Sequence, residues 1–174
     1  MFNILINAFN LYYMEGFTMK IVLGSDKSGF LLKEAVKAHL TTLGHEVFDI
    51  GTQDMEHGVP YFEVAPKAAE MIQSKEYHKG ILCCGTGMGM AIVANKYQGV
   101  YAAVVESVYA AKKCRAINNA NILTMGGWVI APEMGIEMVD AFLNTEFTQD
   151  LEAWRQDFLK NAYKKVGELE ETIY

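Results

Sequence analysis

The sequence predicts an α/β domain in which a parallel sheet of five strands is covered by helices on both faces. From residue 19 onward, strand-like and helix-like runs alternate five times and are separated by short turns. The strand-like runs are short and almost continuously apolar, as expected for strands buried on both faces of a parallel sheet. Repeated strand-helix units require right-handed crossovers, which place the helices on the faces of the sheet. No internal repeat or low-complexity tract interrupts the pattern.

Local signals support the individual elements in order. The first expected helix has an apolar stripe at helical spacing, and Gly44 is expected to end it at the C′ position. Ser107 is the expected N-cap of the helix after the fourth strand. The expected strands are residues 21–23, 46–50, 80–84, 100–105 and 121–126, and the expected helices are residues 31–43, 61–74, 88–96, 108–118 and 132–144.

Two terminal segments flank this body of residues 19–147. Residues 1–18 are apolar and aromatic, but they lack a basic start and contain three asparagines, so they resemble neither a signal peptide nor a membrane span. They are either an extension packed on the body or a stretch upstream of a true translation start at Met19. Residues 148–174 are charged and carry apolar side chains at helical intervals, which predicts a helix that docks on the body or on a second subunit.

The composition narrows the classes of partner. A chain of 174 residues with 51% hydrophobic residues is the size of one domain with a sizeable core. A net charge of −6 lacks the basic surplus that binding to nucleic acid or an anionic membrane requires, so small molecules and other subunits are the expected partners. The three cysteines form neither a disulfide framework nor a metal-ligand pattern. We therefore expect no metal, no cofactor and a cytoplasmic location.

The run from Cys83 to Met90 reads Cys-Cys-Gly-Thr-Gly-Met-Gly-Met and joins the third expected strand to a helix. Such a turn lies at the carboxyl edge of a parallel sheet, where open α/β sheets bind ligands. Glycines there expose backbone N–H groups that can hold an anion, and these groups favour the thiolate form of the neighbouring Cys84. A thiolate in this position can serve as a base or a nucleophile.

Three interpretations of this turn compete. In the first, Cys83 and Cys84 are buried apolar residues and the glycines only permit a tight turn. In the second, the turn binds a dinucleotide, but the pattern G-x-G-x-x-G fails at Met90 and no Walker-type lysine follows. The third, a nest for phosphate or an oxyanion with a thiol at its lip, agrees best with the glycine spacing.

Ordered motifs over most of the chain carry a family resemblance. They are Gly-Ser-Asp-Lys-Ser-Gly at 24–29, Gly-His-Glu-Val at 44–47, Asp-Ile-Gly-Thr at 49–52, the run 80–96, Asn-Asn-Ala-Asn at 118–121 and Met-Gly-Gly at 125–127. Together they resemble the ribose-5-phosphate isomerase B and galactose-6-phosphate isomerase family, from Met19 to about Phe147. The resemblance implies a three-layer, Rossmann-like α/β/α sandwich and metal-independent aldose-ketose isomerisation of a small phosphorylated sugar. It also implies a homodimer or homotetramer whose active sites are shared between subunits.

The resemblance assigns roles to individual residues. Cys84 would be the base that moves a proton between C1 and C2 of the sugar, through an enediolate held by hydrogen-bond donors. Asp26 matches a sugar-contacting aspartate, and Asn118 falls in a substrate-contacting segment. For Asp26 the alternative is a capping aspartate, and for Asn118 and Asn119 it is a turn that ends a helix. The residues expected to hold the enediolate are Gly85, Thr86, Gly87, Met88 and Gly89.

Departures from the family pattern bear on the substrate. Lys27 stands where many members have a histidine, and a lysine can still meet a phosphate as a point charge. The ring-opening histidine after the fourth strand is replaced by Glu106, which would act as an acid if burial raised its pKa. Ile117 replaces a second histidine. The arginine-rich tail is also missing, which leaves Lys27, Arg115 or Arg155 as phosphate ligands, or else as solvated surface charges.

Loss of the ring-opening acid favours a substrate that has no ring. A four-carbon aldose 4-phosphate has its O4 blocked and cannot close a furanose, so we expect a tetrose phosphate beside ribose 5-phosphate and galactose 6-phosphate as candidates. The alternative function is a non-catalytic subunit or a phosphosugar sensor of the same fold. Retention of Cys84 argues against that alternative, and loss of both histidines argues partly for it.

Overall fold

The computed structural model describes residues 18–174, so the expectation for the N-terminal extension lies outside the described residues except at Thr18. The sheet has five parallel strands in the order β2-β1-β3-β5-β4. Its strands are β1 (Lys20–Ser25), β2 (Glu46–Asp49), β3 (Lys79–Cys84), β4 (Ala102–Val104) and β5 (Ile122–Gly126). The predicted parallel sheet is confirmed, with every strand close to its predicted bounds.

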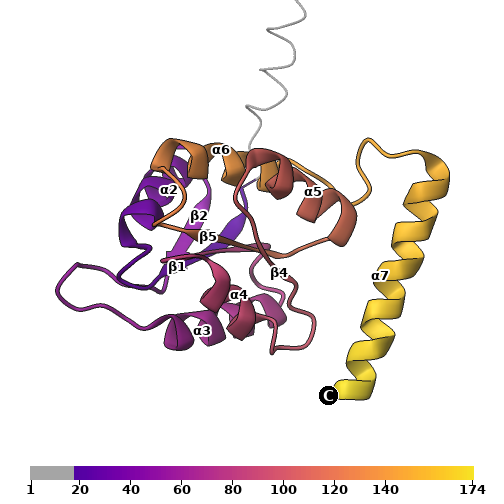
Figure 1. Ribbon diagram of the computed structural model, residues 1–174, viewed down its shortest axis with the longest axis horizontal. Coiled ribbons are helices and arrows are strands. Elements are labelled where there is room, and N and C mark those ends of the chain that lie inside the picture. The colour runs from indigo at the N-terminus through magenta and orange to yellow at the C-terminus, as the bar shows by residue number, and fades with distance from the viewer. Residues whose placement is uncertain (1–17) are drawn as a thin grey trace, which may run out of the picture.

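Helices cover both faces of this sheet, as Figure 1 shows. On one face lie α2 (Phe30–Thr42), α5 (Val108–Asn118) and α6 (Pro132–Leu143), and on the other lie α3 (Tyr61–Gln73) and α4 (Met88–Ala94). Leu23 packs into the first layer and Val22 into the second, because successive side chains of a strand point to opposite faces. The predicted three-layer sandwich is therefore confirmed.

The terminal helix α7 (Ala153–Ile173) stands beside this sandwich. Tyr163 makes ring contacts with Tyr101 and Phe147, at centroid distances of 5.4 and 5.5 Å. The Glu170 carboxylate accepts hydrogen bonds from the Tyr101 hydroxyl at 2.9 Å and from the Gly99 N–H at 3.2 Å. The helix is thus held near the edge strand β4, while Trp154 and other apolar side chains along it stay exposed.

The predicted helix ends also agree with the structure. The Ser107 hydroxyl accepts the Ala110 N–H at 3.2 Å and caps α5, and Gly44 follows α2 with φ +81°. Helix α4 is shorter than expected because Asn95 pairs with β4: its side chain accepts the Ala102 N–H at 2.7 Å and donates to the Ala102 carbonyl at 2.9 Å. Within residues 18–174, no helix combines the length and apolar character that crossing a bilayer requires.

The strand order reverses direction at the centre of the sheet. From β1 the chain moves outward to β2, and it then returns to form β3 on the other side of β1. The carboxyl ends of β1 and β3 therefore lie next to each other, with Ser25 opposite Cys83. In open α/β sheets such a reversal of strand order leaves a crevice at the carboxyl edge, which is where ligands bind.

Candidate active site

Asp26 and Cys84 both lie at this reversal of strand order, Asp26 directly after β1 and Cys84 at the end of β3. The Asp26 N–H donates to the Cys83 carbonyl at 3.2 Å, which continues the pairing of β1 with β3. The Asp26 carboxylate accepts the Gly29 N–H at 3.0 Å, as the capping alternative predicts, and its expected contact with the sugar stays a prediction. Partial burial raises the pKa of Asp26, against the opposing effect of hydrogen bonds from the Gly29 and Ser28 backbone. The carboxylate thus caps the turn that follows β1 at the carboxyl edge of the sheet.

The two adjacent cysteines have different environments. Cys83 is fully buried in the α2, α5 and α6 layer, and desolvation raises its pKa, so it is a packing residue. Cys84 faces the α3 and α4 layer and keeps 5% of its surface exposed. The Gly87 N–H donates to the Cys84 Sγ at 3.0 Å. A donor at this distance stabilises negative charge on the sulfur.

The geometry of the glycine turn explains two of its glycines. Gly87 has φ +78°, a left-handed conformation that a side chain would strain, and it is this conformation that accompanies the N–H contact with the sulfur. A Cβ on Gly85 would lie 2.8 Å from the ring of Trp128. The Trp128 N–H donates to the Gly85 carbonyl at 3.0 Å, and the Gly127 N–H donates to the Cys84 carbonyl at 2.7 Å. The turn after β5 is thereby joined to the turn after β3.

Trp128 was not among the residues that the sequence assigned to the site. Its ring covers Gly85 next to Cys84, yet 75% of its surface is exposed. Its position directly after Gly126 and Gly127 at the end of β5 was the available signal, because residues at a strand's carboxyl end reach the same edge of the sheet.

Thr86, Met88 and Gly89 complete the turn at the start of α4. The Thr86 hydroxyl accepts the Met88 N–H at 3.4 Å, and the Met88 side chain is exposed. Gly89 packs on the ring of Tyr61, since a Cβ there would lie 3.0 Å from that ring. The turn residues therefore lie between β3 and α4 as expected, and the Gly87 N–H points to the Cys84 sulfur.

Lys27 and Glu106 are both exposed. Lys27 follows Asp26 and lies against Gly58, where an added Cβ would approach the Lys27 Cβ to 3.0 Å. Glu106 lies between β4 and α5, and the burial on which its expected role as an acid depended is absent in the single chain. The role of Glu106 as an acid therefore stays a prediction for the assembled protein.

Arg115 is not a solvated surface charge, so that alternative is wrong. Its guanidinium is buried with 4% exposure and donates to the carbonyls of Thr145 and Ala120 and to the Asn119 side chain. It lies at the C-terminal end of α5 and interacts electrostatically with Lys79, the first residue of β3. That is the amino edge of the sheet, opposite to Cys84. Protein acceptors occupy the guanidinium, and the expected role as a phosphate ligand beside Cys84 of the same chain has no geometric basis.

Asn118 lies at the same amino edge, at the end of α5, and is exposed. Asn119 follows with φ +53° and ends the helix, as the alternative for this segment predicted. The structure therefore brings together the residues after β1 and β3 and keeps Asn118 apart from them within one chain.

Two cavities of the described chain lie away from Cys84. One of about 370 Å³ is lined by Asn118 and by side chains of β4, α5 and α7, including Tyr101 and Tyr163. The other, of about 490 Å³, lies between β2 and α3. Within residues 18–174, no group of three or more His, Cys, Asp or Glu side chains is arranged to hold a metal ion.

Known proteins resemble the chain over most of its length. A family model described as Ribose/Galactose Isomerase matches residues 21–159. The 4-deoxy-4-sulfo-D-erythrose isomerase of Clostridium sp. (strain MSTE9) is 64% identical over 156 residues, which cover 90% of this chain and 98% of that relative. The D-erythrulose-4-phosphate isomerase of Pectobacterium atrosepticum is 36% identical over 74% of this chain and 85% of that relative.

The fold has solved counterparts. The ribose-5-phosphate isomerase B of Clostridium thermocellum superposes with a TM-score of 0.81 at 37% identity, over 90% of this chain and 100% of that one.

Proposed function

This chain belongs to the ribose/galactose isomerase family, and within that family we propose that it interconverts 4-deoxy-4-sulfo-D-erythrose and the corresponding ketose. The observation that carries the proposal is the 64% identity across 98% of a relative with that name. The alternatives within the family, ribose 5-phosphate, galactose 6-phosphate and a tetrose 4-phosphate, are compared directly in the test below.

The chemistry of this substrate agrees with the absence of the family's ring-opening histidine and arginine-rich tail from this sequence. A sulfonate bonded to C4 leaves no O4 to close a furanose ring, so the aldehyde is already open and no acid is needed to open it. Glu106 and Ile117 stand where the family's pattern has histidines. A sulfonate also carries a single negative charge, whereas a phosphate monoester approaches two at neutral pH. One exposed lysine, Lys27, suits that smaller charge without an arginine-rich tail.

We assign proton transfer to Cys84. Its thiolate removes the proton from C2 of the aldose and the electron pair forms the enediolate; the proton of O2 passes to O1, and the proton on the sulfur returns to C1 to give the ketose. The Gly87 N–H at 3.0 Å supports the anionic sulfur, so this donor serves the base and not the enediolate. The enediolate oxygens are assigned to the Thr86 hydroxyl and the remaining N–H groups of the turn, and a sugar hydroxyl to Asp26.

We also propose that each active site is shared between two subunits, as in the family to which the chain belongs. Cys84 ends β3, and Asn118 lies at the opposite edge of the sheet, so one substrate cannot touch both within a single chain. The low exposure of Cys84 and its absence from both cavities also suit a site completed by a partner. The reaction as proposed uses no metal and no cofactor.

Turnover of four substrates tests the reaction. Full-length protein is assayed by proton NMR with 4-deoxy-4-sulfo-D-erythrose, erythrose 4-phosphate, ribose 5-phosphate and galactose 6-phosphate. We expect the sulfo sugar to have the highest kcat/KM, with deuterium from D2O appearing in the ketose at C1. Preference for ribose 5-phosphate would refute the open-chain argument, and binding without any turnover would favour the sensor alternative.

Two cysteine variants test the base. Cys84→Ala should lower kcat by about 100-fold to 10,000-fold, the usual contribution of a general base, with little change in substrate binding. Cys114→Ala is the matched control, because Cys114 is buried in α5 and burial raises its pKa to about 11. Full activity of Cys84→Ala would exclude the proposed mechanism.

Subunit mixing tests the shared site. Cys84→Ala and Asn118→Ala are each inactive by this proposal, but a mixed dimer has one site with neither change. A mixture with exchanged subunits should regain about a quarter of the wild-type activity, because half of the dimers are mixed and each has one intact site. No regained activity after verified exchange would mean that each site belongs to one chain.

A further inference from the structure

Lys33 is a buried cation that the proposed reaction does not use. It lies on α2 with no exposed surface, although lysine is rarely fully buried without a partner. Its Nζ contacts the Asp49 Oδ2 at 2.6 Å, the Glu34 Oε1 at 2.8 Å and the Thr52 carbonyl oxygen at 2.6 Å. Three acceptors compensate the desolvation of the ammonium group.

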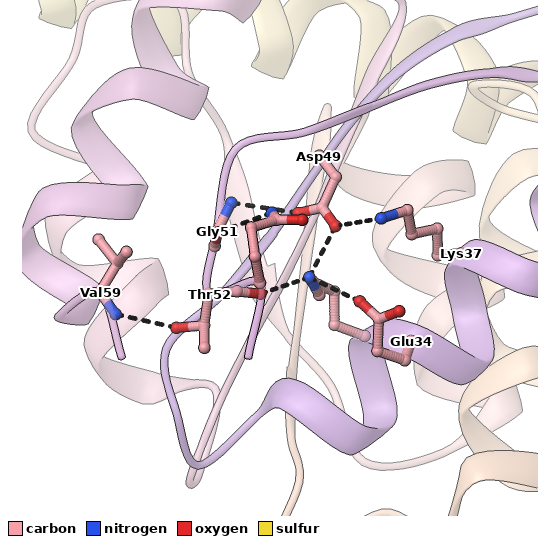
Figure 2. A network of polar contacts seen from close by, with 8 residues as sticks. Glu34, Lys37, Asp49, Gly51, Thr52 and Val59 are labelled. Carbon is pink, nitrogen blue, oxygen red and sulfur yellow. Dashed lines mark hydrogen bonds and ion pairs between the residues drawn. The ribbon is translucent and has the colours of Figure 1, made fainter. Parts of the chain in front are cut away.

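The carboxylate of Asp49 is the centre of this network, which Figure 2 shows from close by. Its Oδ2 also accepts the Lys37 Nζ at 2.8 Å, and its Oδ1 accepts the Gly51 N–H at 3.2 Å. Burial alone would raise the pKa of Asp49, but the hydrogen bonds from Lys33 and Lys37 outweigh it and the pKa is lowered. The network thus fixes the chain where β2 ends.

Thr52 extends the network to the segment of residues 52–59, which connects β2 to α3 without regular structure. The Thr52 N–H donates to the Ser25 carbonyl at 2.8 Å, and its side-chain oxygen accepts the Val59 N–H at 3.0 Å. Both ends of the 52–59 segment therefore meet at one buried residue, whose carbonyl is held by Lys33. Residues 53–58 between them are exposed.

The 52–59 segment and the start of α3 that follows it each reach the candidate site at one place. Gly58 packs against Lys27, with an ideal Cβ only 3.0 Å from the Lys27 Cβ. After Pro60, Tyr61 begins α3 and its ring lies against Gly89 of the glycine turn. The segment thus contacts the lysine assigned to the anionic end of the substrate, and the helix that follows it contacts the turn that holds Cys84.

We propose that Lys33 is a positioning residue, which holds the 52–59 segment through Thr52 as a wall of the substrate site between Lys27 and the glycine turn. The inference rests on the proposed function for the identity of that site. A purely structural role makes a different prediction: removal of one partner of a buried ion pair lowers the stability of the protein, without a specific effect on the 52–59 segment or on substrate binding. Hydrogen exchange in the segment and KM therefore separate the two roles.

Three variants form the test. Lys33→Met keeps the volume and removes the ammonium group, and Thr52→Val removes the acceptor for the Val59 N–H without leaving a buried charge. Lys37→Met is the matched control, because Lys37 bonds the same Asp49 oxygen but has no contact with Thr52. Amide hydrogen exchange over residues 52–59, measured without substrate, is combined with kcat and KM for 4-deoxy-4-sulfo-D-erythrose.

Lys33→Met should speed exchange in the 52–59 segment at least about tenfold and raise KM about tenfold, with a smaller change in kcat. Thr52→Val should shift both quantities in the same direction, and Lys37→Met should stay within about twofold of wild type. Unchanged exchange and unchanged KM in Lys33→Met would overturn the proposal.

Other outcomes are also decisive. If Lys33→Met does not fold, the same two measurements on Thr52→Val decide the role of the segment. If the wild-type protein does not convert the sulfo sugar, the proposed function fails, and exchange in the substrate-free protein still decides whether Lys33 holds the segment.

Discussion

Replacing Gly85 by alanine should impair catalysis with little loss of stability. The added Cβ would lie 2.8 Å from Cε3 and Cζ3 of Trp128, whereas carbon atoms in contact prefer about 3.5 to 4.0 Å, so the ring must move by roughly 1 Å. Since 75% of Trp128 is exposed, the ring can move outward, and we expect a stability loss of no more than about 1 kcal/mol.

The catalytic effect should be larger because the two turns are joined. Hydrogen bonds from the Trp128 and Gly127 N–H groups reach the carbonyls of Gly85 and Cys84, at 3.0 and 2.7 Å. Any part of the ring's movement that the Trp128 backbone takes up therefore shifts the residue that carries the thiol. Because a misplacement of about 1 Å can cost about 100-fold in rate, we expect kcat/KM of Gly85→Ala to fall between about 10-fold and 100-fold.

A double-mutant cycle measured with the NMR isomerisation assay tests this reasoning. Trp128→Ala removes the clashing ring, so the double variant should recover to within about threefold of Trp128→Ala alone. Trp154→Ala, at the other tryptophan of the chain, is exposed on α7 and should give no recovery. Independent effects of Gly85→Ala and Trp128→Ala, or full activity of Gly85→Ala, would refute the proposed coupling.

The remaining predictions concern charge and docking. Asp26→Asn should raise the melting temperature at neutral pH while lowering activity, because partial burial raises the pKa of Asp26 and its ionisation therefore opposes folding. The gain in melting temperature should shrink as the pH falls toward 3.8. A lower melting temperature of the variant at neutral pH would contradict this prediction. Arg115→Ala should lower the free energy of unfolding by about 3 kcal/mol, measured by chemical denaturation, since it leaves three buried or half-buried acceptors without a donor. The control Asn118→Ala should change the free energy of unfolding by no more than about 0.5 kcal/mol, and equal losses in the two variants would refute this distinction. Glu170→Gln should increase the rate of limited proteolysis in α7 by weakening contacts to Gly99 and Tyr101, and an unchanged rate would show that apolar packing alone holds that helix.

The elements of the sandwich were predictable because their signals are local. Buried parallel strands are apolar runs, and Gly44 and Ser107 mark helix ends through their own conformation and side chain. The length of α4 was less predictable. Its end depends on Asn95 pairing with Ala102 of another strand, which helical periodicity does not reveal.

The charged residues show the limit of reading a sequence alone. Lys33 falls on the buried face of α2, three residues before Val36 and seven before Leu40, and this spacing was an available sign of burial. Its partners Asp49 and Thr52 come from a different part of the chain, so no pattern within the helix identifies them. Arg115 was open to two interpretations, phosphate ligand or surface charge, for the same reason.

The amino-acid pattern alone was enough to predict the alternation of strands and helices along the chain and the position of Asp26 and Cys84 at the carboxyl edge of the sheet. Both follow from side-chain periodicity and from the handedness of crossovers, which act over neighbouring residues. The folded chain was needed to show which groups contact the thiol, the Gly87 N–H among them, and which charges are buried. Those outcomes depend on distances between segments far apart in the chain, and packing sets these distances only after the whole sheet has assembled.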